Sequence, residues 1–262
     1  MTPAYIVARV FAGLIVGILV GLTGVGGGIL LVPILTSALG VPPIIAVGSD
    51  AAVNCITKLG AGLVHWRRGN VNWDLVLALT LGSIPGAACG VAVLHRLHTV
   101  KGQTANNVLM SVIAILLIVI PAASLYLHSS RAAKEELPAA RIRYGIVLIG
   151  FLAGALVGLT SIGSGAVPLL LLLVFYNYAP RSIVGTDVIH GLVLTAFTSV
   201  LQMRLGNVDF KLVAYILAGS IPGGILGAYL TKFFPAERLK RVLFIMLILF
   251  GVKILWEGLA RA

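Results

Sequence analysis

Two stretches of the chain place polar and ionisable side chains at helical spacing within otherwise apolar sequence. Asp50, Asn54 and Lys58 follow one another at intervals of four, so on a helix they share one face. Asp187 and His190 lie three positions apart and would also face one side of a helix. Such groups could bind an anion through the lysine and carry a proton through a carboxylate or the imidazole.

Each of these side chains also has an ordinary structural explanation. Asp50 and Asp187 follow Gly-Ser and Gly-Thr and precede apolar sequence, so both could be helix N-caps. Lys58 could extend along its helix toward the basic segment 65–68 and reach water there. His190 could be a structural histidine with satisfied hydrogen bonds. The elements around these residues therefore decide which explanation applies.

The composition predicts an all-α polytopic membrane protein. Of the 262 residues 59% are hydrophobic and only 10% are charged, whereas soluble domains carry about 25% charged residues. The long stretches between Arg9 and Asp50 and between Arg143 and Arg181 contain no Asp, Glu, Lys, Arg or His. Since about 20 residues cross the hydrocarbon as a helix, each stretch holds one crossing and an additional segment.

The chain also contains an internal repeat. Residues 13–90 and 150–227 align without a gap and are identical at 26 of 78 positions. The matched segments include GLTGVGGG at 21–28 with GLTSIGSG at 158–165, and GSIPG at 82–86 with GSIPG at 219–223. Duplicated apolar segments broken by glycine are typical of secondary transporters that bind substrate between two repeats.

We expect four transmembrane helices in each repeat. The first repeat covers residues 1–127, a polar connector covers 128–142, and the second repeat covers 143–262. The helices are expected near 5–22, 44–64, 75–95, 105–127, 143–158, 181–203, 211–231 and 238–258, with short apolar pieces at 29–39 and 166–177. Four crossings in each half would make the repeats parallel, and an odd number would make them inverted.

The glycine-rich segments 21–28 and 158–165 are the second chemical feature. Glycine lowers helix stability by about 1 kcal/mol relative to alanine, so these segments predict a helix break. A helix restarting near Gly28 would leave backbone N–H groups that could donate to an anion. Close helix packing through small residues is the alternative explanation. The candidate substrate-binding residues are Thr23, Gly26, Gly27, Gly28, Asn54, Lys58, Thr160, Ser161, Gly163, Ser164 and Gly165, and those for proton coupling are Asp50, Asp187 and His190.

The two GSIPG segments and the charge balance have simpler explanations. Proline within a helix removes a backbone hydrogen bond and kinks the span, so GSIPG is expected to shape the bundle. The net charge of +11 is typical of basic loops and anionic lipid and indicates an anionic substrate only weakly. No metal-ligand, cofactor or nucleic-acid signature is visible, and an oligomer is compatible with the sequence without being supported by it.

The glycine-rich segments, the turns GNVNW at 69–73 and GNVDF at 206–210, and both GSIPG segments resemble the sulfite exporter TauE/SafE family of bacterial membrane permeases. The resemblance covers nearly the whole chain apart from the connector. Many members carry Gly-Thr-Ser where this chain has Gly-Ser-Asp50 and Gly-Thr-Asp187. A subgroup has these aspartates, a Thr-Lys like Thr57-Lys58 and a histidine like His190.

The resemblance implies a multi-pass permease of the bacterial inner membrane that transports sulfite or another sulfur-containing anion. It also implies that the protein is not an enzyme. Together with the candidate site residues, the resemblance favours a transport mechanism of proton-coupled alternating access, in which one repeat rocks against the other. The alternatives are a passive anion channel, which would use the same donors, and a membrane enzyme acting on a lipid phosphate. Against the enzyme, no nucleophile-with-base arrangement is visible.

Overall fold

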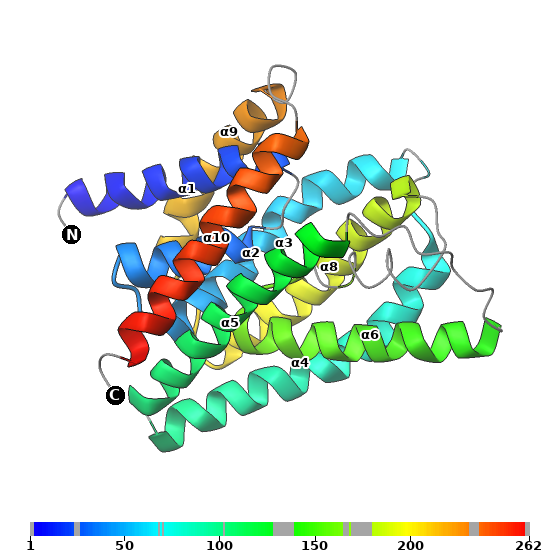
Figure 1. Cartoon of the computed structure of the whole chain (residues 1–262), viewed down its shortest axis with the longest axis horizontal. Coiled ribbons are helices and arrows are strands. Elements are labelled where there is room, and N and C mark those ends of the chain that lie inside the picture. Colours follow the sequence, from blue (N-terminus) through cyan, green and yellow to red (C-terminus); the bar gives the residue numbers. More distant parts are fainter. Residues whose placement is uncertain are drawn as a thin grey trace.

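The computed structural model describes residues 3–23, 27–67, 69, 71–101, 103–127, 139–164, 168, 180–230 and 236–259, and within these ranges every regular element is a helix. The helices are α1 (Pro3–Thr23), α2 (Gly28–Pro33), the π-helical turn η1 (Ile34–Ala38), α3 (Pro43–Arg67), α4 (Trp73–Lys101), α5 (Gln103–Leu127), α6 (Ala139–Thr160), α8 (Pro180–Arg204), α9 (Phe210–Leu230) and α10 (Ala236–Leu259). Figure 1 shows them as an elongated bundle of obliquely crossing helices.

The all-helical fold and its long helices match the sequence prediction. The helices α1, α3, α4 and α5 precede the connector, and α6, α8, α9 and α10 follow it. In the first glycine segment α1 is described to Thr23 and α2 begins at Gly28 after a turn residue, Gly27, which agrees with the predicted break; residues 24–26 lie outside the described residues. Residues 128–138 of the connector and all but residue 168 of the piece expected at 166–177 lie outside the described residues.

Length and hydropathy identify helices that can cross a bilayer. In the described ranges both requirements are met at Pro43–Arg67, Trp73–Val100, Asn106–Ala123 and Phe210–Gly227. Shorter apolar helices lie at Tyr5–Val20, Gly28–Ala38, Tyr144–Thr160 and Leu247–Trp256. The tryptophans near helix ends, Trp66, Trp73 and Trp256, are all exposed, as expected of side chains at the membrane surface.

The helices pair across the two halves of the sequence. The two most extensive interfaces join α1 to α9 and α4 to α6, while α3 packs on α8 and α5 on α10 (Figure 1). The repeat alignment converts the first interface into the second, because it sets α1 against α6 and α4 against α9. The common origin of the halves stays a prediction, but their helices are interleaved in space.

Glycine brings the paired helices into backbone contact. A Cβ atom at Gly154 of α6 would lie 2.6 Å from the Cα of Ser83 on α4, and one at Gly17 of α1 would lie 2.8 Å from the Cα of Ser220 on α9. Neither interface leaves room for a larger residue at these positions, as expected where small residues let transmembrane helices approach closely. The same holds for Gly13, Gly82, Gly86, Gly90, Gly150, Gly158, Gly219, Gly223 and Gly227.

The GSIPG segments lie inside these interfaces. Pro85 is within α4 and Pro222 within α9, so both lie mid-helix as the sequence predicted. The glycines that flank them, at 82, 86, 219 and 223, face the backbone of the partner helix. The segments therefore contribute to helix packing, which agrees with the expectation that they shape the bundle.

The short helix α2 lies in the interior of the protein. The whole of Gly28–Pro33 is buried, and its aliphatic side chains belong to a core formed with α1, α3, α5, α9 and α10. At 1.5 Å per residue, α2 and η1 together span only about half of the hydrocarbon thickness.

Two reciprocal hydrogen bonds fix the turns that follow α3 and α8. The amide of Asn72, before α4, donates to Oγ1 of Thr186 on α8 at 2.9 Å. The amide of Asp209, before α9, donates to Oγ of Ser49 on α3 at 3.1 Å. The residue preceding each candidate aspartate therefore holds a turn of the opposite half, which positions α3 and α8 relative to the rest of the bundle.

Candidate substrate site

Asp50 and Asp187 are buried within helices and do not cap them. Because α3 begins at Pro43 and α8 at Pro180, both aspartates lie two turns inside their helices. Asp50 is 0% exposed and Asp187 is 7% exposed. The N-cap explanation is therefore wrong for both residues, since the helix has already begun before each of them.

Lys58 is directed into the protein and joins the two halves. Its Nζ donates to the carbonyl oxygen of Ser164 at 2.8 Å and to the Ser164 hydroxyl at 3.0 Å. Its ammonium also interacts electrostatically with Asp187 on α8 and Asp50 on its own helix. The alternative in which Lys58 extends toward water is thus wrong, since hydrogen bonds and opposite charges inside the protein hold the ammonium.

Gly191 on α8 leaves the space that Lys58 occupies. A Cβ atom at this position would overlap Nζ of Lys58 and the carbonyl oxygen of Ser164. The repeat alignment sets Asn54 against Gly191, so the first half has an amide side chain where the second half has none. The missing side chain allows the ammonium to reach the second glycine segment.

The second glycine segment forms a turn after α6. Ser161 has φ = +58° and Gly163 has φ = +94°, backbone conformations that reverse the chain direction at the helix end. The hydroxyl of Thr160 donates to the carbonyl oxygen of Leu156 at 2.8 Å and accepts from the amide of Ile162 at 3.2 Å. Thr160 therefore stabilises the turn itself, whereas Ser164 presents both of its oxygens to Lys58.

The first glycine segment packs against the polar face of α3 and against the second glycine segment. A Cβ atom at Gly28 would lie 2.5 Å from the Ser161 carbonyl oxygen and 2.8 Å from Oδ2 of Asp50, and one at Gly27 would lie 2.9 Å from Oδ1 of Asn54. Nδ2 of Asn54 donates to Oδ2 of Asp50 at 2.8 Å. The glycine segments of both halves therefore meet at the polar face of α3.

The side chain of Ser161 also faces Asp50. Its hydroxyl interacts with the Asp50 carboxylate from beyond hydrogen-bond distance or angle, and no described residue satisfies it in hydrogen-bond geometry. A small shift of Ser161 toward Asp50, or a bound ligand, could therefore give this hydroxyl a hydrogen-bond partner. The two glycine segments and α3 together form one buried polar cluster.

His190 is buried and pairs with a serine of the first half. Its Nε2 lies 2.9 Å from the hydroxyl of Ser83 on α4, and its imidazole is 0% exposed. Among the described residues no hydrogen bond joins His190 to Asp187. Each of the two keeps one buried polar atom, Nδ1 of His190 and Oδ1 of Asp187, without a hydrogen-bond partner in the described part of the chain.

The fold thus assembles most, but not all, of the residues that the sequence singled out. Two groups of candidate residues converge between α3 and the glycine segments. One is Lys58 with Ser164, and the other is Asp50 with Asn54, Gly27, Gly28 and Ser161. Thr23 is the last residue of α1. Gly26 and Gly165 lie outside the described residues.

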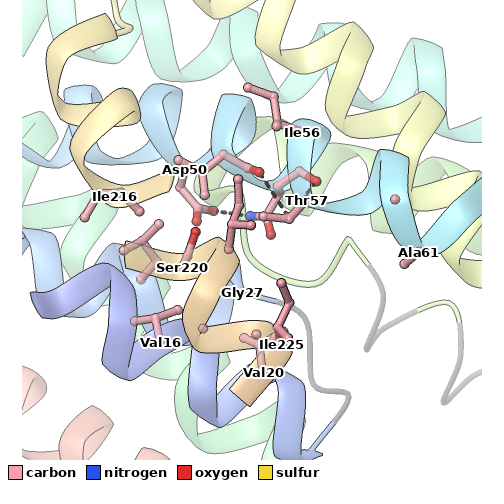
Figure 2. A pocket seen from close by; sticks show the side chains of 17 residues that line it. Val16, Val20, Gly27, Asp50, Ile56, Thr57, Ala61, Ile216, Ser220 and Ile225 are labelled. Carbon is pink, nitrogen blue, oxygen red and sulfur yellow. Dashed lines mark hydrogen bonds between the residues drawn. The ribbon is translucent and has the colours of Figure 1, made fainter. Parts of the chain in front are cut away.

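A cavity of about 680 Å³ adjoins this cluster on the side of the first glycine segment. Helices α1, α3 and α9 form its walls, and Figure 2 shows Asp50, Thr57 and Ser220 at its surface. Lys58 and His190 are not among the described residues that line it. The ammonium of Lys58 therefore does not face this cavity, although Asp50 and Asn54 of the same polar face do.

Sequence reasoning missed three contributors to the site. Ser83 and Ser220 occupy equivalent places in the two GSIPG segments, yet Ser83 pairs with His190 and Ser220 lines the cavity. Gly191 makes room for Lys58. The two serines could have been found from the sequence, because a hydroxyl within a repeated transmembrane motif is a candidate polar contact. Gly191 could not, because a glycine that only leaves space has no side chain to indicate its role.

Buried charges within apolar helices, unpaired polar atoms beside them and a cavity that adjoins them are the features expected of the site of a membrane transporter. The sequence profile of the sulfite exporter TauE/SafE family matches residues 9–254, and the chain belongs to this family. It is a multi-pass membrane transporter and not an enzyme.

Several bacterial relatives share nearly the full length of the chain. The probable membrane transporter protein YjnA of Bacillus subtilis is 37% identical over 253 residues, which cover 95% of this chain and 99% of the relative. YdhB of the same organism is 26% identical over 250 residues, 92% of this chain and 97% of the relative. A probable membrane transporter protein of Xylella fastidiosa is 26% identical over 269 residues, 99% of this chain and 98% of the relative. No solved structure matches the chain.

Proposed function

We propose that the protein is a secondary transporter that moves a small sulfur-containing anion, such as sulfite or an organosulfonate, across the bacterial inner membrane. The supporting observation is the ammonium of Lys58, which donates to Ser164 of the opposite half at the point where the two glycine segments meet. A half-buried ammonium whose partners include a neutral carbonyl and a hydroxyl can exchange these for an anion. The name of the family supports the sulfur-containing substrate.

In this proposal the anion binds at Lys58 and at the second glycine segment. The hydroxyls of Ser164 and of the buried Ser161 would donate to its oxygens. Backbone N–H groups would come from both glycine segments. The second segment would contribute those of Gly163 and Gly165, and the first those of Thr23, Gly26, Gly27 and Gly28. Asn54 would orient Asp50, to which its amide already donates.

The charges near the site favour proton coupling. Asp187 and Asp50 both interact with the single ammonium of Lys58, so the three groups together carry one excess negative charge when all are ionised. An entering anion would add to this charge in an interior that stabilises charge poorly. Protonation of Asp187 or Asp50, or of His190, would offset the added charge, and the proton would leave with the substrate.

The interleaved helices suggest which parts move. A rocking motion of residues 1–127 against residues 143–262 would separate α1 from α9 and α4 from α6, whose backbones touch through glycine. We therefore propose that each of these pairs moves as a unit about the central α3 and α8, and that their relative motion opens the site to each side in turn.

Flux of ³⁵S-labelled sulfite into proteoliposomes, with and without an imposed pH gradient, tests this function. A carrier gives saturable uptake that the gradient accelerates and that unlabelled sulfite on the far side stimulates by counterflow. Fast flux without saturation or counterflow would identify a passive channel. Absence of flux for sulfite and for organosulfonates, in protein shown to be folded, would overturn the proposed substrate class.

A further inference from the structure

The cavity beside Asp50 has apolar walls and one charged group. Of the described residues that line it, only Asp50, Asn54, Thr57 and Ser220 carry polar side chains, and none is basic. Its volume of about 680 Å³ lies within the range of about 300–1,000 Å³ that is typical of small-molecule sites. A small inorganic oxyanion would leave most of this space empty and would meet a carboxylate.

Two buried oxygens in the cavity lack a hydrogen-bond partner among the described residues. Oδ2 of Asp50 accepts from Asn54 at 2.8 Å, whereas Oδ1 of the same carboxylate has no partner. The hydroxyl of Ser220, on the opposite wall, is also unpartnered. Asp50 is 0% and Ser220 is 7% exposed. The Ser161 hydroxyl also interacts with the Asp50 carboxylate, but it is not among the described residues that line the cavity. Since a buried acceptor without a donor is destabilising, the two oxygens at the cavity could accept hydrogen bonds from a ligand there.

Lys58 does not provide such a donor. It is two turns further along α3, and its Nζ donates to the carbonyl oxygen and the hydroxyl of Ser164. Lys58 is also absent from the described lining of the cavity. The carboxylate of Asp50 therefore faces an apolar space in which no protein cation among the described residues lies.

In the second half an aromatic side chain packs against the residues that align with part of the cavity lining. Phe197 packs against Ala87, Val157 and Leu194. The repeat alignment sets these side chains against residues that all line the cavity, namely Gly60, Gly224, Val20 and Thr57. In the first half the position aligned with Phe197 is Gly60, where a Cβ atom would meet nothing within 4 Å, so no side chain from this position enters the cavity.

We propose that the cavity is a binding site for an organic ammonium ion. Its apolar body would occupy the space between α1, α3 and α9, and its ammonium would donate to Oδ1 of Asp50 and to the hydroxyl of Ser220 (Figure 2). An ammonium supplies the missing donor, and it adds positive charge to a cluster in which Lys58 alone faces the two carboxylates of Asp50 and Asp187. The cavity does not include Lys58, although Gly27, Asp50 and Asn54 belong to both proposals. The inference does not depend on the proposed transport of sulfite.

Calorimetry on the purified protein in lipid nanodiscs tests the charge preference. The probe is 2-phenylethylammonium, the matched anion of similar shape is 3-phenylpropionate, and empty nanodiscs correct for partition into lipid. We expect saturable binding of the ammonium at least tenfold tighter than that of the anion. The substitution Asp50→Asn should remove this preference, because it keeps the side-chain shape and deletes the charge.

Two substitutions from different helices test the location. Gly60→Phe on α3 and Ile225→Trp on α9 both fill the cavity and should each weaken binding of 2-phenylethylammonium at least tenfold. Gly60→Ala is the matched control, since a Cβ atom there meets no atom within 4 Å, and it should bind as the unmodified protein does. A thermal unfolding midpoint near that of the unmodified protein identifies the folded variants.

Three results would overturn the proposal. The first is no saturable binding of the ammonium, and the second is binding of 3-phenylpropionate that is as tight or tighter. The third is ammonium binding that persists in both folded cavity-filling variants. Titration with NaCl provides a further comparison, because saturable binding of Na⁺ in place of the ammonium would assign the carboxylate to an inorganic cation and contradict an organic ligand.

Discussion

The Nζ atom of Lys58 lies 2.8 Å from the carbonyl oxygen of Ser164, a residue 106 positions away in the sequence. This hydrogen bond joins α3 to the turn that follows α6, and it places the lysine of the polar α3 face between the two halves. The relationship makes Lys58 the residue on which anion binding is expected to depend most.

The first prediction concerns the charge of Lys58. Lys58→Met keeps the length of the side chain and removes the ammonium, so sulfite affinity in proteoliposomes should fall at least tenfold, which corresponds to about 1.4 kcal/mol. Lys211→Met removes an exposed lysine at the start of α9 and serves as the control. Unchanged affinity in Lys58→Met would remove this residue from the anion site.

The second prediction concerns coupling to protons. Asp187 is buried and interacts electrostatically with Lys58, so Asp187→Asn should leave sulfite exchange measurable while abolishing its acceleration by a pH gradient. Asp74→Asn changes an exposed aspartate in the first turn of α4 and should retain the full acceleration. Gradient-driven uptake at the normal rate in Asp187→Asn would show that the proton binds elsewhere.

The third prediction compares two adjacent glycines of α9. A Cβ atom at Gly223 would overlap the carbonyl oxygen of Leu14 on α1, whereas one at Gly224 would come no nearer than 3.8 Å to Gly17. Gly223→Ala should therefore destabilise the protein by about 1–3 kcal/mol through overpacking. Gly224→Ala should be neutral or stabilising by up to about 1 kcal/mol, because alanine favours helix.

Thermal unfolding of both alanine variants in nanodiscs measures this difference. The two substitutions add the same methyl group to the same helix, so a lower midpoint for Gly223→Ala alone isolates the contact between α1 and α9. Equal midpoints would contradict the close packing of these helices.

Elements that depend on local composition could be predicted from the sequence. Long apolar runs indicated the helices, and the glycines at 21–28 indicated the break before α2, because both follow from the chemistry of a few neighbouring residues. Asp50 and Asp187 could also be found from the sequence, because each is an ionisable residue within a locally apolar stretch. Their place two turns inside each helix was not evident from the sequence, which left an N-cap as an alternative.

Relationships between distant residues could not be predicted in this way. No local pattern indicates that Lys58 reaches Ser164 or that His190 pairs with Ser83, since both contacts depend on how α3, α4 and α8 pack. The cavity was missed because it depends on how α1, α3 and α9 pack, and because Gly60, which lines it, has no side chain that would indicate it. The alignment of the repeats sets Gly60 against Phe197. The sequence alone does not tell what this difference does, because that depends on where the Phe197 side chain packs.

The fourth prediction concerns the reciprocal bonds that hold the turns. Thr186→Val keeps the side-chain shape and leaves the amide of Asn72 without the hydroxyl that accepts its hydrogen bond. The expected loss is about 1 kcal/mol of stability. Thr99→Val is the control, because Thr99 is exposed and its hydroxyl donates to the carbonyl oxygen of Arg96 in its own helix. Equal unfolding midpoints for the two variants would show that the bond between the halves is not stabilising.

The fifth prediction tests how Lys58 reaches its partner. Because a Cβ atom at Gly191 would overlap Nζ of Lys58 and the carbonyl oxygen of Ser164, Gly191→Ala should displace the ammonium and reduce sulfite affinity about tenfold without changing any charge. Gly62→Ala is the control, since its added methyl would meet mainly the end of the Ile189 side chain at 3.1 Å, which can move aside. Normal sulfite affinity in a folded Gly191→Ala variant would mean that the position of the ammonium beside Ser164 is not required for anion binding, whereas a loss confined to this variant would assign the open space at Gly191 to the substrate site.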